Sequence, residues 1–287
     1  MQSVHLEFNN NPQNSYQFNG TVLSSINNDI DLEKDLGIVT DSSLSWNLQI
    51  RAAISKATQM IAWITRNTIS REQGVMTHIY KTIVRHHLEY CVQVWSPDAQ
   101  HGNWGIILDI EAVQRRFTRL IDEIGLLPYS ERLERLGFTT LAERRIRGDL
   151  IETYKIVNGI VPYCGNLFSH SRSGLNLISR LPVSNNNTIK KGIRSHFSHK
   201  VIKYWNLLPT YCKKSTSVNN FKANLESFKK SNCHVADSGN FWEVSDLVLS
   251  KIEGPSYLKN KSLHNKYLMA NSAVARRKGF NTFMATV

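Results

Sequence analysis

The stretch that decides the fold is WNLQIRAAISKATQMIAWI, residues 46–64. Its apolar side chains recur every three or four residues, at Ile50, Ile54, Ala57, Ile61 and Ile64. This spacing places them on one face of an α-helix, for which Ser45 is the expected N-cap. The helical period continues toward residue 160, so the sequence predicts a mainly α-helical protein.

Capping signals divide the downstream pattern into further helices. A capping box at 70–73 opens a second helix, which Pro97 stops, and another box at 140–143 opens a helix that ends at Gly159. The apolar stripe of the second helix is expected at Val75, Ile79, Ile83, His87, Tyr90 and Val94. Two more helices are expected at 106–124 and 130–136. The sequence therefore predicts a small helical bundle in this half of the chain.

Upstream of residue 46 the pattern has the period of β-strands. Asn19-Gly20 lies between two β-rich runs within 15–23, which is a strong signal for a hairpin. Further strands are expected at 4–8 and 36–40. The acids Asp29, Asp31, Glu33 and Asp35 are expected to form a solvated loop before the last strand. A small antiparallel β-hairpin or sheet is thus predicted at the N-terminus.

Beyond residue 160 the helical period is interrupted. Residues 161–190 are rich in Ser, Asn and Gly and predict a long loop or linker. Helices return at 194–207, at 218–230 with Ser217 as its cap, and near 241–252 and 256–278. The chain is therefore divided into a β segment at 1–45, a helical bundle at 46–160, a basic linker with helices at 161–235, and a helical tail at 236–287.

Charge is unevenly distributed along the chain. The formal net charge is +12, yet residues 1–45 carry one Lys and six acids. No Asp or Glu lies between Glu152 and Glu226, whereas 11 Lys or Arg residues do. An uncompensated positive stretch of this length suits a polyanion such as nucleic acid, and its alternative is a solubilising surface segment.

Two groups of basic residues are candidates for phosphate contacts. The first lies on the predicted helix 106–124, opposite its apolar stripe, and the second occupies the acid-free stretch. For the first group, the alternative is a solvated helix face whose charges pair with Glu111 and Asp122. The aromatic residues of the second group, Phe197, Tyr204 and Trp205, are expected in the core rather than stacked on bases. The candidate nucleic-acid-binding residues are Arg115, Arg116, Arg119, Lys190, Lys191, Arg194, Lys200 and Lys203.

No motif of enzyme chemistry accompanies these basic residues. The sequence contains no Gly-rich phosphate loop, no Gly-x-Ser-x-Gly elbow and no His-Glu-x-x-His. It also contains no Asp-Asp pair, so two-metal phosphoryl transfer has no evident ligand set. His87 and Cys91 share one helical face, but they are expected to pack in the core, because a structural zinc site needs two more ligands. We therefore expect no catalytic residue, no metal site and no cofactor.

Several blocks in this order resemble a known family. They are EKDLGIVTDSSLSW (33–46), YKTIVRHHLEYCVQVWSP (80–97), EAVQRRFTRLI (111–121), ERRIRGDLIETYKIVNG (143–159) and WNLLP (205–209). Together they resemble the region after the polymerase palm in reverse transcriptases of non-LTR (LINE-type) retrotransposons, especially jockey-like elements. The resemblance implies a palm-edge remnant at 1–45 followed by a helical thumb and a C-terminal domain. In the intact RNA-directed DNA polymerase, Mg²⁺ is bound by a palm Asp-Asp motif that nothing in this sequence matches.

The resemblance implies a C-terminal fragment of a transposable-element reverse transcriptase. Such a fragment would bind an RNA or DNA template–primer duplex without base preference, and would be inactive alone. The alternatives are a retained protein-interaction module and a retroelement remnant without function. No apolar run spans a membrane and no secretory leader opens the chain, so an intracellular location is expected, in the nucleus or cytoplasm, with reduced cysteines.

Overall fold

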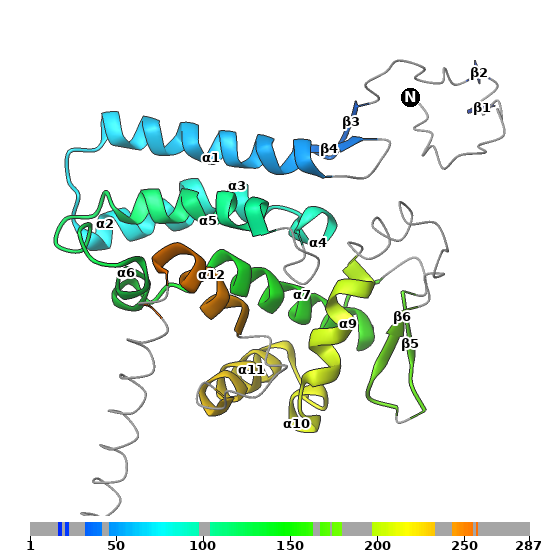
Figure 1. Cartoon of the computed structure of the whole chain (residues 1–287). Helices are drawn as coiled ribbons and strands as arrows, with labels where there is room; N and C mark the ends of the chain where they lie inside the picture. The colour runs from blue at the N-terminus through cyan, green and yellow to red at the C-terminus, as the bar shows by residue number, and fades with distance from the viewer. Residues whose placement is uncertain are drawn as a thin grey trace, which may run out of the picture.

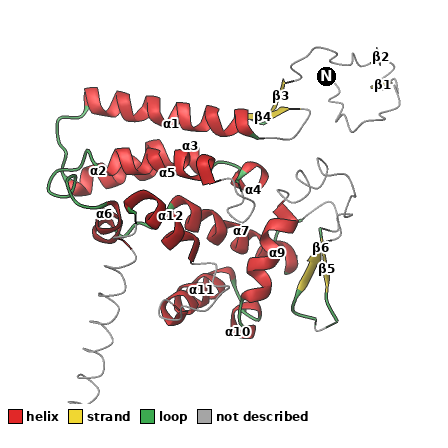
Figure 2. Ribbon diagram, viewed as in Figure 1, coloured by secondary structure: helices red, strands yellow, loops and turns green. Residues whose placement is uncertain are grey.

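A computed structural model gives the structure of the chain, and it describes residues 17–18, 21–22, 32–41, 46–97, 104–162, 167–172, 174–179, 197–232, 243–254 and 257. The described part is mainly helical, with short antiparallel hairpins, as Figure 2 shows. The predicted fold class is therefore confirmed, including the small β structure near the N-terminus. None of the helices in these ranges is both long enough and apolar enough to cross a membrane.

The first hydrophobic core lies between α1 (Asn47–Asn67), the helical segment 73–95 and α5 (Trp104–Thr118). These helices run alongside one another in Figure 1. The stripe predicted for α1 is confirmed, since Ile50, Ala57, Ile61 and Ile64 are buried and Ile54 packs partly buried against them. This core holds α1 and α5 together through apolar contact.

The helical segment 73–95 buries a different face from the one predicted. It consists of α2 (Gln73–Ile79), a π-helical turn η1 (Tyr80–Val84), α3 (Arg85–Glu89) and α4 (Val92–Trp95). The buried side chains are Met76, Tyr80, Val84, Leu88, Val92 and Trp95, whereas Val75, Tyr90 and Val94 are exposed. The predicted stripe is confirmed at Ile79 and Ile83, which pack partly buried against the first core, and is wrong at Val75, Tyr90 and Val94. The column of residues beside the predicted one is also apolar in sequence, and it is the one that is fully buried. A spacing of four residues also suits the wider π turn, which keeps the buried column facing α1 and α5.

A second core gathers the C-terminal helices around α7 (Leu141–Val157). It is built with α9 (Phe197–Leu207), α10 (Thr210–Lys213), α11 (Val218–Asn232) and α12 (Glu243–Glu253), which surround α7 in Figure 1. Leu141 of α7 belongs to the first core, and Ile146, Leu150 and Tyr154 belong to the second. α7 is thus shared between the two cores, and α6 (Tyr129–Leu136) packs against both α5 and α12.

Three two-stranded antiparallel hairpins complete the described fold. β1 (Gln17–Phe18) pairs with β2 (Thr21–Val22) across the predicted Asn19-Gly20 turn, so this hairpin is confirmed. β3 (Leu32–Asp35) pairs with β4 (Ile38–Asp41), which confirms the strand expected near 36–40 but corrects the loop expected at Glu33 and Asp35. β5 (Phe168–His170) pairs with β6 (Leu177–Ser179), so the expectation of an unstructured linker at 161–190 is wrong for this part. The strand predicted at 4–8 lies outside the described residues.

Helix caps agree with the sequence in two places and differ in one. The Thr140 hydroxyl accepts a 3.3 Å hydrogen bond from the Glu143 amide, and the Ser217 hydroxyl accepts one of 3.1 Å from the Asn220 amide. The capping box predicted at 70–73 is wrong, because α2 begins after Glu72 without a side-chain cap. The expected cap Ser45 lies outside the described residues, and Trp46 occupies the N-cap position of α1 in the left-handed region.

Candidate nucleic-acid interface

Three arginines emerge near the C-terminal end of α5. Arg116 and Arg119 are exposed, and Arg115 is half-buried. Within the described part of the chain, no carboxylate lies within 4 Å of any of their guanidinium groups. Guanidinium groups without an internal carboxylate partner keep their donors available for bidentate contact with phosphate. We call this group the α5 arginine cluster.

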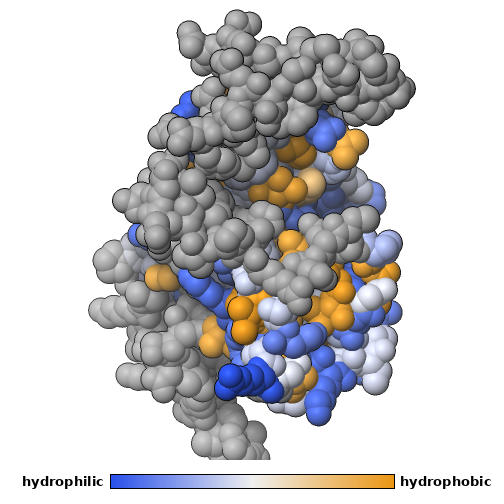
Figure 3. All heavy atoms as spheres, turned by 90° about the vertical axis from the view of Figure 1, so that its right-hand side faces the viewer, coloured by the Kyte–Doolittle hydropathy of each residue, from blue (hydrophilic) through white to orange (hydrophobic). Residues whose placement is uncertain are grey.

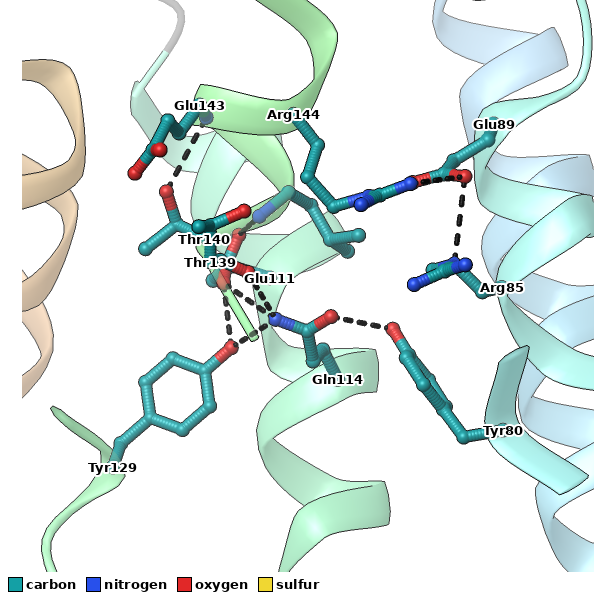
Figure 4. A network of polar contacts seen from close by, with 11 residues as sticks. Tyr80, Arg85, Glu89, Glu111, Gln114, Tyr129, Thr139, Thr140, Glu143 and Arg144 are labelled. Carbon is teal, nitrogen blue, oxygen red and sulfur yellow. Dashed lines mark hydrogen bonds and ion pairs between the residues drawn. The ribbon is translucent and has the colours of Figure 1, made fainter. Parts of the chain in front are cut away.

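An adjoining, buried face of α5 is fixed by a polar network, drawn in Figure 4. The Tyr80 hydroxyl donates to Gln114 Oε1 at 2.7 Å, and Gln114 Nε2 donates to the Tyr129 hydroxyl at 2.9 Å. The Tyr129 hydroxyl in turn donates to Glu111 Oε1 at 2.5 Å, and the Leu141 amide donates to Glu111 Oε2 at 2.9 Å. The network thus joins η1, α5, α6 and the first residue of α7, which sets the rotation of α5 and the side on which its arginines emerge.

Burial dominates the electrostatics of this network. Burial raises the pKa of Glu111 to about 7, against the opposing effects of the Tyr129 hydrogen bond, the Arg145 charge and the backbone amides. Burial and the neighbouring Glu111 also raise the pKa of Tyr129 well above its ordinary value, so its hydroxyl stays protonated and can donate. Glu111 is therefore a structural acceptor rather than a partner for the exposed arginines.

Arg132 of α6 holds the end of α5 from the same side as Tyr129. Its Nη1 donates to the Arg115 carbonyl at 2.9 Å and to the Thr118 hydroxyl at 2.8 Å. Burial lowers the pKa of Arg132, and repulsion by Arg119 and Arg115 lowers it further. Three guanidinium groups, those of Arg115, Arg119 and Arg132, are thus close enough to repel one another, and the Glu253 carboxylate offsets only part of this repulsion at Arg132. The surplus of positive charge favours an anion at this end of α5. The sequence reasoning missed Arg132, although its position beside Leu133 and Leu136 in a short helix is a signal of an inward-facing arginine.

The alternative role for these arginines was pairing with Glu111 and Asp122. Glu111 is fully buried in the network, and its carboxylate accepts from Tyr129 and Leu141. Asp122 donates its backbone amide to the Arg71 carbonyl, and no ion pair joins its carboxylate to an arginine among the residues described. Neither acid therefore neutralises the α5 arginine cluster.

The arginines of α7 have structural roles. Arg144 forms a bidentate ion pair with Glu89, which also lies 3.5 Å from Arg85. Arg147 Nε donates to Glu226 Oε1 at 2.8 Å and so ties α7 to α11. Arg145 is buried, lies over the ring of Trp95, and has its pKa lowered by burial. These three arginines connect helices and are not free to contact a partner.

The second predicted basic group is only partly available. Lys200 is a correction to the prediction, because its side chain is 4% exposed and its Nζ lies 3.0 Å from Asp149 Oδ2 inside the protein. An ammonium group buried in this way cannot reach a phosphate. Lys203, on the next turn of α9, is exposed. Lys190, Lys191 and Arg194 lie outside the described residues. As predicted, Phe197, Tyr204 and Trp205 are buried in the core.

The structure separates the two predicted basic groups. The C-terminal end of α5 lies beside α2 and α6, whereas α9 lies at the other end of the molecule, beside β5 and β6 (Figure 1). Figure 3 views the side that carries β5, β6 and α9, and hydrophobic and hydrophilic residues are interspersed over its described atoms. The α5 arginine cluster and Lys203 therefore do not form one continuous contact surface.

No metal-binding group accompanies this site among the residues described. Over the described ranges, no three His, Cys, Asp or Glu side chains gather in a way that could hold a metal ion. His87 is half-buried and lines a pocket rather than the core, while Cys91 packs partly buried against the first core.

Neither the protein-family models, nor the curated proteins, nor the solved structures contain a match to this chain.

Proposed function

We propose that this protein binds nucleic-acid duplexes through their phosphates and without base preference, with the α5 arginine cluster as its principal contact. The observation that carries the proposal is that Arg115, Arg116 and Arg119 have no carboxylate within 4 Å among the described residues. They lie in the last turn of α5 and directly after it, on a helix that a buried network fixes. When guanidinium groups without a carboxylate partner neutralise phosphates, the counterions condensed on the nucleic acid are released, and this release favours binding. The proposal agrees with the resemblance to the thumb and C-terminal region of non-LTR reverse transcriptases, and it assigns no catalytic step to this chain.

Salt dependence tests this proposal directly. Affinity for a fluorescent RNA–DNA duplex should fall linearly on a log–log salt plot, with a slope of about −0.9 for each phosphate neutralised. Replacing Arg115, Arg116 and Arg119 with Gln should flatten that slope by up to about three, because each lost cation releases one counterion fewer. Duplexes of different sequence should bind with similar affinity.

A matched variant separates a local site from net charge. Arg51, Lys214 and Lys222 also carry three positive charges, lie on other helices or their ends, and form no ion pair within the described ranges. Their triple replacement with Gln should change the slope much less than the α5 triple. Equal flattening by both triples would show that binding follows net charge and is not centred on α5.

A second candidate function is supported by exposed apolar side chains near the same end of the molecule. Ile69 is 99% exposed and Leu126 is fully exposed. They lie on two loops that are joined by the hydrogen bond from the Asp122 amide to the Arg71 carbonyl. Exposed apolar residues of this kind favour contact with another protein surface. If the wild-type chain shows no duplex affinity even at low salt, this interaction-module function replaces the first proposal.

A further inference from the structure

The described fold contains a pocket of about 510 Å³ that the proposed duplex contact does not use. It lies between the β3–β4 hairpin, α1 and α3. Two hydrogen bonds fix its walls: the Val39 amide donates to Gln49 Oε1 at 2.9 Å, and the Tyr90 hydroxyl donates to the Leu36 carbonyl at 2.9 Å. Ile38 of β4 is buried in the first core, which anchors the hairpin further. A pocket of this volume with fixed walls is within the range of small-molecule sites.

The charge of the pocket favours an anion. Lys34 and Lys56 line it from the hairpin and from α1, and His86 and His87 line it from α3. Glu89 is the one carboxylate among the described lining residues, and it is paired with both Arg85 and Arg144. Its negative charge is therefore already compensated, so the two lysines leave the pocket with a positive surplus.

Aromatic rings form part of the same lining. The His86 and His87 rings have their centroids 3.9 Å apart, and the ring of Tyr90 lies alongside Gly37. A planar aromatic base stacks favourably on rings of this kind, and lysines contact a phosphate as point charges. We propose that this pocket binds a nucleotide, with its phosphate at Lys34 and Lys56 and its base against the rings of His86, His87 or Tyr90. The inference is independent of duplex binding at α5, and either can fail alone.

Binding should take up a proton at His87. Burial lowers the pKa of His87, and the neighbouring His86 and Lys56 lower it further. The charged groups that face it are Lys34, Lys56, His86 and the paired Glu89. A bound phosphate would offset the repulsion between the cations and raise the pKa of His87. The phosphate itself gains a proton at about pH 6, so the effect is read as a difference: relative to His87→Gln, the affinity of the wild type should increase as the pH falls below about 6.5.

Calorimetric titration of the full chain with AMP tests the site. We expect saturable binding with one AMP per chain, and no comparable binding of adenosine, which lacks the phosphate. Replacing Lys34 and Lys56 with Gln should weaken binding about tenfold or more, because charge-assisted hydrogen bonds are lost. Arg51→Gln removes a neighbouring exposed cation that does not line the pocket, and it should leave AMP affinity unchanged. His87→Gln should flatten the pH dependence.

A second variant tests the space and not the charge. Ala52 lines the pocket from α1, and Ala52→Leu should block AMP binding while preserving both lysines and the melting temperature.

The terminal nucleotide of a bound strand carries the same phosphate and base as free AMP, so a strand end is the alternative ligand. If a 5′-phosphorylated oligonucleotide binds with the same dependence on Lys34 and Lys56 and AMP does not, the ligand is a strand end. If neither ligand binds saturably at about pH 6, or if the double lysine variant binds like the wild type, the inference is overturned.

Discussion

Lys200 Nζ lies 3.0 Å from Asp149 Oδ2, and the two side chains are only 4% and 1% exposed. The pair joins α9 to α7 inside the second core. Both residues lie on the buried columns of their helices: Lys200 is three residues after Phe197, and Asp149 is three residues after Ile146. Many of the residues near Lys200 in the sequence are also basic. In the folded chain, however, its positive charge is neutralised by an acidic residue of another helix, Asp149 of α7.

Removing one partner of this pair should strongly destabilise the protein. Lys200→Met removes the ammonium group that is paired with the buried Asp149 carboxylate, and we expect a loss of about 3–5 kcal/mol in the free energy of unfolding. The double variant Lys200→Met with Asp149→Leu should recover part of that loss, because neither charge of the pair is left without the other, although the buried Arg145 loses the nearby Asp149 charge. Urea denaturation of the two single variants and the double variant measures the coupling.

Lys203 supplies the matched control for this prediction. It lies one turn further along α9 and is exposed, so Lys203→Met should change the free energy of unfolding by no more than about 0.5 kcal/mol. If Lys200→Met proves as mild as Lys203→Met, the pair does not have the buried environment described above.

The burial of Lys200 shows which part of a basic site can be read from sequence. The positions of Phe197, Val201 and Tyr204 define the buried face of α9, and Lys200 falls on that face. Charge density along the sequence ignores this rotation, so it placed Lys200 on the surface. For α5, the apolar stripe did predict the side on which Arg116 and Arg119 are exposed. Their lack of a carboxylate partner depended on distant residues, and only the folded chain reveals it.

The buried carboxyl of Glu111 should make stability depend on pH. Burial raises its pKa to about 7 in the folded protein, whereas an exposed Glu titrates at about 4.3. The folded state therefore binds the proton more tightly than the unfolded state. The stability from this group is fully present below about pH 4.3 and is lost as the pH rises through about 7. The loss over this range is ~4 kcal/mol.

Comparison with Glu111→Gln isolates this contribution from other titrating groups. His87 and His199 have pKa values lowered mainly by burial, so their contributions to stability change in the opposite direction over part of the same range. Urea denaturation between about pH 4.5 and pH 8 should show wild-type stability falling relative to Glu111→Gln as the pH rises. A constant difference between the two proteins across this range would contradict the raised pKa.

The tip of the β3–β4 hairpin contains a strained residue that can be improved. Leu36 has φ 46° and is 83% exposed, and it is followed by Gly37 with φ 85°. A leucine in the left-handed region costs roughly 1–2 kcal/mol, while Asn tolerates this conformation better. Leu36→Asn should therefore raise the free energy of unfolding by up to about 1 kcal/mol, and Leu36→Ala should not. Thermal melting of the two variants distinguishes relief of strain from loss of the side chain.

The two N-terminal hairpins show why turn chemistry predicts one and not the other. Asn19-Gly20 is the preferred pair for a tight hairpin turn, and the hairpin was predicted from it. Leu36-Gly37 lacks the favoured first residue, so β3 was interpreted as a loop. Two hydrogen bonds with residues distant in sequence hold this hairpin: the Tyr90 hydroxyl donates to the Leu36 carbonyl, and the Val39 amide donates to Gln49 Oε1. Tertiary contacts of this kind override local preference and are not visible in the hairpin sequence.

The turn after α5 should be intolerant of any side chain at Gly125. A Cβ built there would lie 2.5 Å from the Arg119 carbonyl oxygen and 3.0 Å from that of Ile121. Both contacts are with backbone, so Gly125→Ala must displace the turn, at a cost of about 1–3 kcal/mol in the free energy of unfolding. Because Arg119 belongs to the displaced segment, the variant should also weaken duplex binding at low salt.

Gly105→Ala is the matched control for this substitution. Gly105 lies in α5 itself, and a Cβ there would meet nothing within 4 Å. Alanine is the better helix former, so this variant should be more stable than the wild type by up to about 1 kcal/mol and should bind duplex normally. Urea denaturation and duplex titration of both glycine variants give the comparison. If Gly125→Ala is as stable as Gly105→Ala, Gly125 does not lie as close to the Arg119 carbonyl as described here. If it is destabilised yet binds duplex with an unchanged salt slope, Arg119 is not a phosphate contact.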